Sequence, residues 1–220
     1  MTNRFSLKVQ DNLRVTGAIS GAWRTMFYMD YFEVKKPVLH CEDVKQAKLF
    51  WKAYKHFFNI NYDHKITWSR EFNSPLAMRI PFEGDFVYEE MKKRLKFKRH
   101  PSHTCFSFLS NKKDHKGLDD QCLQDVISLL DPVAIDLSDS RNFKNINELI
   151  TKLTILFHAN LYIGSDCSWN NIAPVFGVPT ILTIQEYPYN STSVLKQIFS
   201  LDRSTGYPIG YEPTDTKSSN

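Results

Sequence analysis

The second half of the chain alternates between short apolar runs and amphipathic stretches, a pattern that indicates strands and helices in turn. Asn145 with Glu148 three residues later has the spacing of a capping box and predicts a helix start. The predicted strands cover 103–109 and 133–137 and begin at Leu161 and Pro179, and the predicted helices cover 118–130 and 145–156 and begin at Ser168. Strand–helix alternation with short connections predicts a parallel sheet with helices on both faces.

The first half has weaker periodicity but the same kinds of element. Strands are predicted over 13–16, 37–40 and 66–69, and helices over 22–31 and 44–58. The pattern indicates a smaller, irregular α/β unit. We place the domain boundary in the basic stretch before Pro101, which predicts domains over 1–98 and 99–200. The polar, proline-containing segment 201–220 is expected to be a frayed tail.

Composition excludes some classes of protein. The 220 residues are 42% apolar and 14% aromatic, enough for a real core. The formal net charge of +4 is too small to indicate nucleic acid as a partner. The basic run Lys92–Arg99 is interpreted as a solvated helix end or linker rather than a site for a phosphate-rich partner.

The four cysteines lack metal-ligand spacing, so we expect free thiols in a reducing compartment. No apolar stretch is long enough to cross a bilayer, and the first residues lack an apolar signal core. These features predict a cytoplasmic protein without a transmembrane segment. The chain could be part of a larger polypeptide.

The segment Gly164–Thr180 is the most informative motif, with the sequence GSDCSWNNIAPVFGVPT between two apolar runs. It predicts a strand, a small polar turn, a short helix from Ser168, a glycine turn and a second strand. Small residues allow a ligand close to the backbone, and a helix start offers N–H groups and the positive end of its dipole. A phosphate would fit there, although an ordinary βαβ turn has the same pattern.

This motif resembles the C-terminal, nucleotide-binding domain of GT-B glycosyltransferases, most closely the heptosyltransferase-type group. The matching residues lie in Asn145–Ile150 and Ala159–Gly164, and continue with Asp166, Ala173 and Gly177–Thr180. The resemblance covers roughly a third of the chain, from about 103 to 184, and implies two small Rossmann-like α/β domains with parallel sheets and a cleft between them.

Two positions depart from the family pattern. Ser168 replaces a glycine, and Asn171 replaces a histidine. Both replacements are compatible with phosphate binding, because a hydroxyl and an amide can donate hydrogen bonds. Asn171 cannot transfer a proton, so no acid role is carried over to it.

The resemblance implies transfer of a sugar from a nucleotide diphosphate sugar to a glycan or other hydroxyl acceptor, with the diphosphate held by helix N-termini and cationic side chains instead of a metal. Uridine is expected on frequency alone, since no residue set selects it. The predicted donor-binding residues are Gly17, Ser20, Gly21, Ser110, Asn111, Lys112, Lys113, Ser138, Asp139, Ser165, Asp166, Cys167, Ser168, Trp169, Asn170 and Asn171. The alternatives for several of them are structural: solvated lysines, a cap or turn at Asp139 and Asp166, and packing of Trp169.

A general base must come from elsewhere, because the donor motif supplies only phosphate-type groups. The family's aspartate after the first strand has no counterpart in Gly17–Gly21. The candidates, in order, are His40 with Glu42 and Asp43, and then Asp11 and Asp30. A helix cap explains Glu42 or Asp43 equally well.

Two other functions remain open. A nucleotide-sugar epimerase or hydrolase of the same fold would need several carboxylates and histidines in the cleft, which the asparagine-rich motif disfavours. A non-catalytic nucleotide- or glycan-binding module would bind without turnover.

Overall fold

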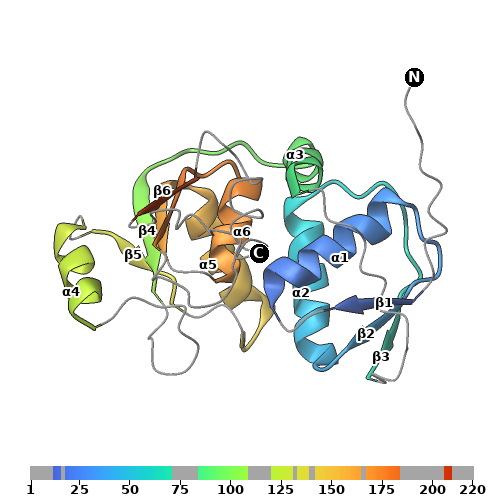
Figure 1. Ribbon diagram of the computed structural model, residues 1–220. Coiled ribbons are helices and arrows are strands. Elements are labelled where there is room, and N and C mark those ends of the chain that lie inside the picture. The colour runs from blue at the N-terminus through green and yellow to red at the C-terminus, as the bar shows by residue number, and fades with distance from the viewer. Residues whose placement is uncertain are drawn as a thin grey trace, which may run out of the picture. The chain divides into compact units, whose positions relative to one another are not determined.

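The computed structural model (Figure 1) describes residues 12–15, 18–70, 84–108, 120–130, 133–138, 142–164, 167–183 and 206–209. The chain forms two compact units. The first combines residues 1–98 with Ser140–Thr154, and the second combines Arg99–Asp139 with Ile155–Asn220. Both units are α/β with parallel sheets, as predicted. The expected cleft between two domains stays a prediction.

The first unit is built on a three-stranded parallel sheet in the order β1-β2-β3. The strands are β1 (Asn12–Val15), β2 (Val38–Cys41) and β3 (Thr67–Ser69), and the helices are α1 (Ile19–Tyr31), α2 (Val44–Phe57) and α3 (Gly84–Lys93). Helix α1 packs against both β1 and α2. It begins earlier than its apolar pattern predicts, so Ser20 and Gly21 lie in its first turn.

Aromatic side chains fill the core of this unit. Trp23 is 1% exposed and meets the rings of Tyr54 and Phe58 edge-on at 6.1 and 5.2 Å between centroids. Its indole N–H donates to the Phe50 carbonyl at 3.1 Å, so the polar atom of the ring is satisfied inside the core. The high aromatic content of the sequence is therefore used to pack α1 against α2.

The segment Ser140–Thr154 joins the first unit through a reciprocal amide contact. The Gln46 amide donates to the Phe143 carbonyl at 2.6 Å and accepts from the Phe143 backbone N–H at 3.2 Å. The Phe143 ring also meets Phe50 edge-on at 6.2 Å. A distant stretch of chain is thus needed to complete the outer side of α2.

The second unit contains a five-stranded parallel sheet in the order β5-β4-β6-β7-β8. The strands are β4 (His103–Ser107), β5 (Ile135–Asp136), β6 (Ala159–Gly164), β7 (Thr180–Thr183) and β8 (Gly206–Ile209), and the helices are α4 (Asp120–Leu129) and α6 (Ser168–Val175). Helix α5 (Ile146–Phe157) is divided between the units: residues 146–154 belong to the first and residues 155–157 to the second. Strand β8 lies in the segment expected to be a frayed tail and pairs with β7.

The capping box predicted at the start of α5 is present. The Asn145 side chain accepts from the Glu148 backbone N–H at 3.0 Å, and the Glu148 carboxylate accepts from the Lys144 N–H at 2.8 Å. The reciprocal bond thus reaches one residue beyond the cap. These contacts satisfy backbone donors at the helix start, which fixes where α5 begins.

The basic run is only partly a solvated helix end. Lys92 and Lys93 pair with glutamates one turn earlier at the end of α3. Arg99 is drawn inward instead, and its guanidinium donates to the carbonyl oxygens of Phe157, Ala159 and Gly177. Burial lowers the pKa of Arg99. One arginine therefore ties the end of α5, the start of β6 and the turn after α6.

Candidate functional site

The chain changes direction at the centre of the second sheet. After β4 it builds β5 on one side, and then crosses to the other side to build β6 and β7. Strands β4 and β6 are neighbours, and their last residues, Ser107 and Gly164, pair directly. In open parallel sheets, ligands bind outside the carboxyl ends of the strands at such a point. The predicted donor motif begins there.

Gly164 ends β6 in a space that admits no side chain. A Cβ atom on this residue would lie 2.4 Å from the Tyr162 hydroxyl and 2.6 Å from the Ser107 carbonyl oxygen. Both separations are far below van der Waals contact. A glycine is thus required for close packing of the two strand ends, and not for an unusual backbone conformation.

Helix α6 begins immediately after this strand end. Cys167 precedes it in an extended conformation, its side chain makes no capping hydrogen bond, and no acidic residue occupies the first turn. The positive end of the helix dipole therefore has no carboxylate in that turn to offset it. Ser168, the first helical residue, is 7% exposed. This arrangement favours an anion at the helix start.

Two hydroxyl groups surround the thiol of Cys167. The Tyr162 hydroxyl lies 3.3 Å from the sulfur, and the sulfur lies 3.8 Å from the Ser107 hydroxyl. Burial raises the pKa of Cys167, although these hydroxyls and the backbone N–H groups of Trp169 and Asn170 oppose the change. The thiol is therefore neutral at neutral pH, and no thiolate would repel a phosphate beside it.

The other described residues of the motif support the helix start from within. Trp169 is fully buried and donates its indole N–H to the Leu137 carbonyl at 2.7 Å, so its ring packs rather than faces a ligand. Asn170 is 5% exposed. The Asn171 amide donates to the Cys167 carbonyl at 3.3 Å, one turn back. This bond braces the first turn of α6.

The remaining donor candidates are divided between described and undescribed parts of the chain. Ser138 is exposed just after β5, and its N–H donates to the Asp136 carboxylate at 2.8 Å. Ser20 and Gly21 are buried at the start of α1, beyond the carboxyl end of β1. The candidates outside the described residues are Gly17, Ser110, Asn111, Lys112, Lys113, Asp139, Ser165 and Asp166.

Three base candidates lie on β2 or just beyond its carboxyl end. His40 is half-buried within β2. Glu42 is exposed, and its carboxylate lies 4.0 Å from the Arg14 guanidinium. Asp43 is the N-cap of α2 and accepts from the Gln46 N–H at 3.0 Å. Asp43 thus has a structural role, and its exposed carboxylate also lies at the ligand-binding edge of the sheet. Asp11 lies outside the described residues.

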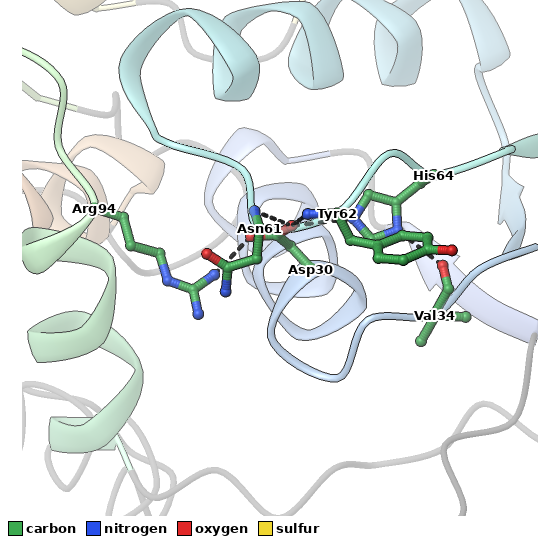
Figure 2. Close-up of polar contacts among 6 residues, drawn as sticks. All are labelled: Asp30, Val34, Asn61, Tyr62, His64 and Arg94. Atoms are coloured by element: carbon green, nitrogen blue, oxygen red, sulfur yellow. Dashed lines mark hydrogen bonds and ion pairs between the residues drawn. The ribbon is translucent and has the colours of Figure 1, made fainter.

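Asp30 has a different environment from the other base candidates. Its carboxylate is fully buried near the end of α1 and has four hydrogen-bond partners (Figure 2). The backbone N–H groups of Asn61 and Tyr62 donate at 2.9 and 3.3 Å and Arg94 donates at 2.6 Å, while His64 Nε2 lies 3.1 Å away. A substrate hydroxyl has no access to this carboxylate, and its surroundings favour a structural role.

Tyr162 and Ser107 are the site residues that the sequence pattern did not single out. Each sits inside a strand, and each reaches the site because β4 and β6 pair in this register. A tyrosine two residues before a glycine at a strand end lies on the same face of the strand. That spacing was the available signal for Tyr162, whereas Ser107 needed knowledge of the strand pairing.

Two kinds of feature are absent from the described ranges. Within them, no group of three or more histidine, cysteine, aspartate or glutamate side chains is placed to hold a metal ion. None of the described helices combines the length and apolar character needed to span a bilayer.

Comparison with known proteins gives matches only to solved structures. No family model matches the chain, and no curated protein matches it. Among the solved structures is the iron-containing dodecameric glycosyltransferase TibC from enterotoxigenic E. coli H10407, at 14% identity and a TM-score of 0.44 over 80% of this chain. The iron-containing heptosyltransferase TibC in complex with ADP-D-β-D-heptose gives 12% identity and a TM-score of 0.42 over 81%. The matches span 59% and 60% of those chains.

Proposed function

We propose that this protein is a glycosyltransferase that moves a sugar from a nucleotide diphosphate sugar to a glycan or other hydroxyl acceptor without a metal ion. The observation that carries the proposal is the meeting of Gly164 and the start of α6 at the carboxyl ends of β4 and β6. The position is the one where open parallel sheets bind ligands, and the helix start favours a diphosphate over a neutral ligand.

The proposed chemistry divides the work between donor and acceptor groups. The leaving diphosphate carries the charge that develops during transfer, and backbone N–H groups fixed at a helix start stabilise such charge without reorganisation. Ser168 adds a hydroxyl donor at the same place. Lys112 and Lys113 are proposed to neutralise the remaining charge, since they follow β4 in the sequence. With these groups, diphosphate binding needs no cation.

The acceptor hydroxyl must lose its proton as it attacks the sugar. We propose His40, Glu42 or Asp43 as the base, with Asp11 next. Glu42 and Asp43 follow the carboxyl end of β2 in the first unit. Asp30 is the least suitable candidate because its carboxylate is buried and fully hydrogen-bonded.

A panel of nucleotide sugars tests the function directly. We expect one donor to raise the melting temperature and to be slowly hydrolysed when no acceptor is present. Both effects should survive dialysis against EDTA. A binding module would give the shift without turnover, and an epimerase would release an isomerised donor. Absence of any shift across UDP-, ADP- and GDP-sugars would contradict the proposed site.

A further inference from the structure

The buried cluster around Asp30 contains a histidine whose two ring nitrogens both face acceptors (Figure 2). His64 Nδ1 lies 2.8 Å from the Val34 carbonyl oxygen, and Nε2 lies 3.1 Å from Asp30 Oδ1. The side chains of His64 and Asp30 are both fully buried. Water therefore cannot replace either contact without opening the cluster.

A neutral imidazole carries one N–H group and one lone pair. If the proton is on Nδ1, the Nε2 lone pair faces a carboxylate oxygen at 3.1 Å. If it is on Nε2, the Nδ1 lone pair faces a carbonyl oxygen at 2.8 Å. Only the imidazolium donates at both positions. The Asp30 carboxylate, in turn, accepts from the Arg94 guanidinium at 2.6 Å and from two backbone N–H groups.

We infer that His64 is a proton-dependent clasp, meaning that its imidazolium form links the connection between α2 and β3 to the end of α1. The folded first unit holds the second ring proton. Loss of that proton weakens the link. The clasp joins segments far apart in the sequence, because Asp30 lies in the last turn of α1 and Val34 follows that helix, while Asn61, Tyr62 and His64 belong to the connection after α2. The backbone N–H groups of Asn61 and Tyr62 also bond to Asp30, so the connection is not wholly released when the proton leaves.

The groups packed around the ring support the charged form. Tyr62 lies against it at 5.3 Å between centroids, and Trp51 meets it edge-on at 5.9 Å. Burial lowers the pKa of His64, but the hydrogen bonds to Asp30 and Val34 and the charges of Asp30 and Asp63 outweigh burial and raise it. Among the described residues, the Tyr54 hydroxyl also interacts with Asp30 and Arg94, and burial raises its pKa, so it stays neutral.

The sign of the pH dependence follows from these contacts. A group that binds its proton more tightly when folded stabilises the fold fully below its unfolded pKa, about 6.5 for histidine. That contribution is lost as the pH rises through the higher folded value. Each unit of difference between the two values changes the folding equilibrium constant tenfold. The first unit should therefore weaken above neutral pH.

The test compares urea unfolding of the full chain between pH 5.5 and 9 for the wild type, His64→Gln and His56→Gln. His56 is an exposed histidine of α2 and serves as the matched control. At pH 5.5 we expect the folding equilibrium constant of His64→Gln to be at least roughly tenfold smaller than that of the wild type. Most of this difference should be gone by pH 9. His56→Gln should follow the wild type at every pH.

Ring nitrogen chemical shifts of the wild type keep the inference testable if His64→Gln does not fold. At pH 6 both nitrogens of His64 should be protonated, and the titration midpoint should lie above the ordinary histidine value of about 6.5. A single protonated nitrogen at pH 6, a midpoint at or below about 6.5, or a pH-independent deficit in His64→Gln would overturn the inference.

Discussion

Gly164 is the residue at which one added carbon atom would disturb the candidate site most. The three atoms that a Cβ would meet belong to two residues of different character. The Tyr162 hydroxyl is the end of a side chain, whereas the Ser107 carbonyl belongs to the backbone of the neighbouring strand. The side chain can be trimmed by mutation, but the backbone cannot, so the two clashes can be separated experimentally.

Gly164→Ala should therefore destabilise the protein by about 1–3 kcal/mol, the usual range for overpacking a buried position. Adding Tyr162→Phe should recover only part of this loss, because the contacts with the Ser107 carbonyl at 2.6 Å and the ring carbon Cζ at 2.8 Å remain. Thermal unfolding of the two single variants and the double variant measures the coupling. An alanine variant as stable as the wild type would mean that the strand ends separate easily.

Ser168→Asp should abolish most donor binding with little change in melting temperature. An aspartate at a helix start interacts favourably with the helix dipole, so the fold should tolerate it, whereas a phosphate would be repelled. Ser102→Asp is the control. Ser102 is exposed just before the amino end of β4, whereas the candidate site lies at the carboxyl end of that strand. Equal nucleotide-sugar affinity in both variants, measured by calorimetry, would remove α6 from the site.

At the scale of elements, the sequence predicted most of what local periodicity can specify. The central parts of α2, α5 and β6 were found where the apolar pattern placed them, because burial of one face repeats within each segment. Helix α3 and strand β8 were not predicted. β8 is a parallel partner of β7, and parallel pairing brings together residues that share no local pattern.

For the candidate site too, only the features that depend on neighbouring residues could be predicted. The motif itself placed the strand end and helix start, since both depend on neighbouring residues. The burial of Asp30 was not predictable, because its partners His64 and Arg94 are 34 and 64 residues away. In the same way, nothing local in the basic run separates Arg94 and Arg99 from the lysines between them.

The capping residue of α5 is a prediction at the element scale. Asn145→Ala should cost about 1 kcal/mol of stability, because the N–H of Glu148 loses its acceptor. Asn145→Asp should keep the cap and most of the stability. Asn59→Ala, at an exposed position outside any helix, provides the comparison in urea unfolding. A loss at Asn59 equal to that at Asn145 would show that the cap contributes nothing.

At the scale of the whole molecule, the residues of the proposed function are divided between the two units. The donor motif lies in the second unit, and His40, Glu42 and Asp43 lie on β2 of the first or just beyond it. Substitutions in the second unit should therefore change the affinity for the donor. Substitutions of the base candidates in the first unit should change only the rate.

One of His40→Asn, Glu42→Gln and Asp43→Asn should lower kcat by at least about 10²-fold at saturating donor, the scale of a positioned base. Asparagine at position 43 can still cap α2, so a lower kcat there would report chemistry rather than folding. Donor affinity should stay near the wild-type value. Normal kcat in all three, and in Asp11→Asn, would favour a mechanism in which the leaving phosphate accepts the proton.

The contact between Gln46 and Phe143 limits how the polypeptide can be divided. No single cut yields either unit whole, since the first unit takes back residues 140–154 after the second has begun. A fragment of residues 1–98 would lose both amide hydrogen bonds of Gln46 to Phe143 and the ring that covers Phe50. We expect this fragment to unfold at lower urea than the same region in the intact chain, and a peptide of residues 140–157 to restore part of the difference. Because the first unit is made of two separate chain segments, neither unit can be exchanged between proteins as one continuous module.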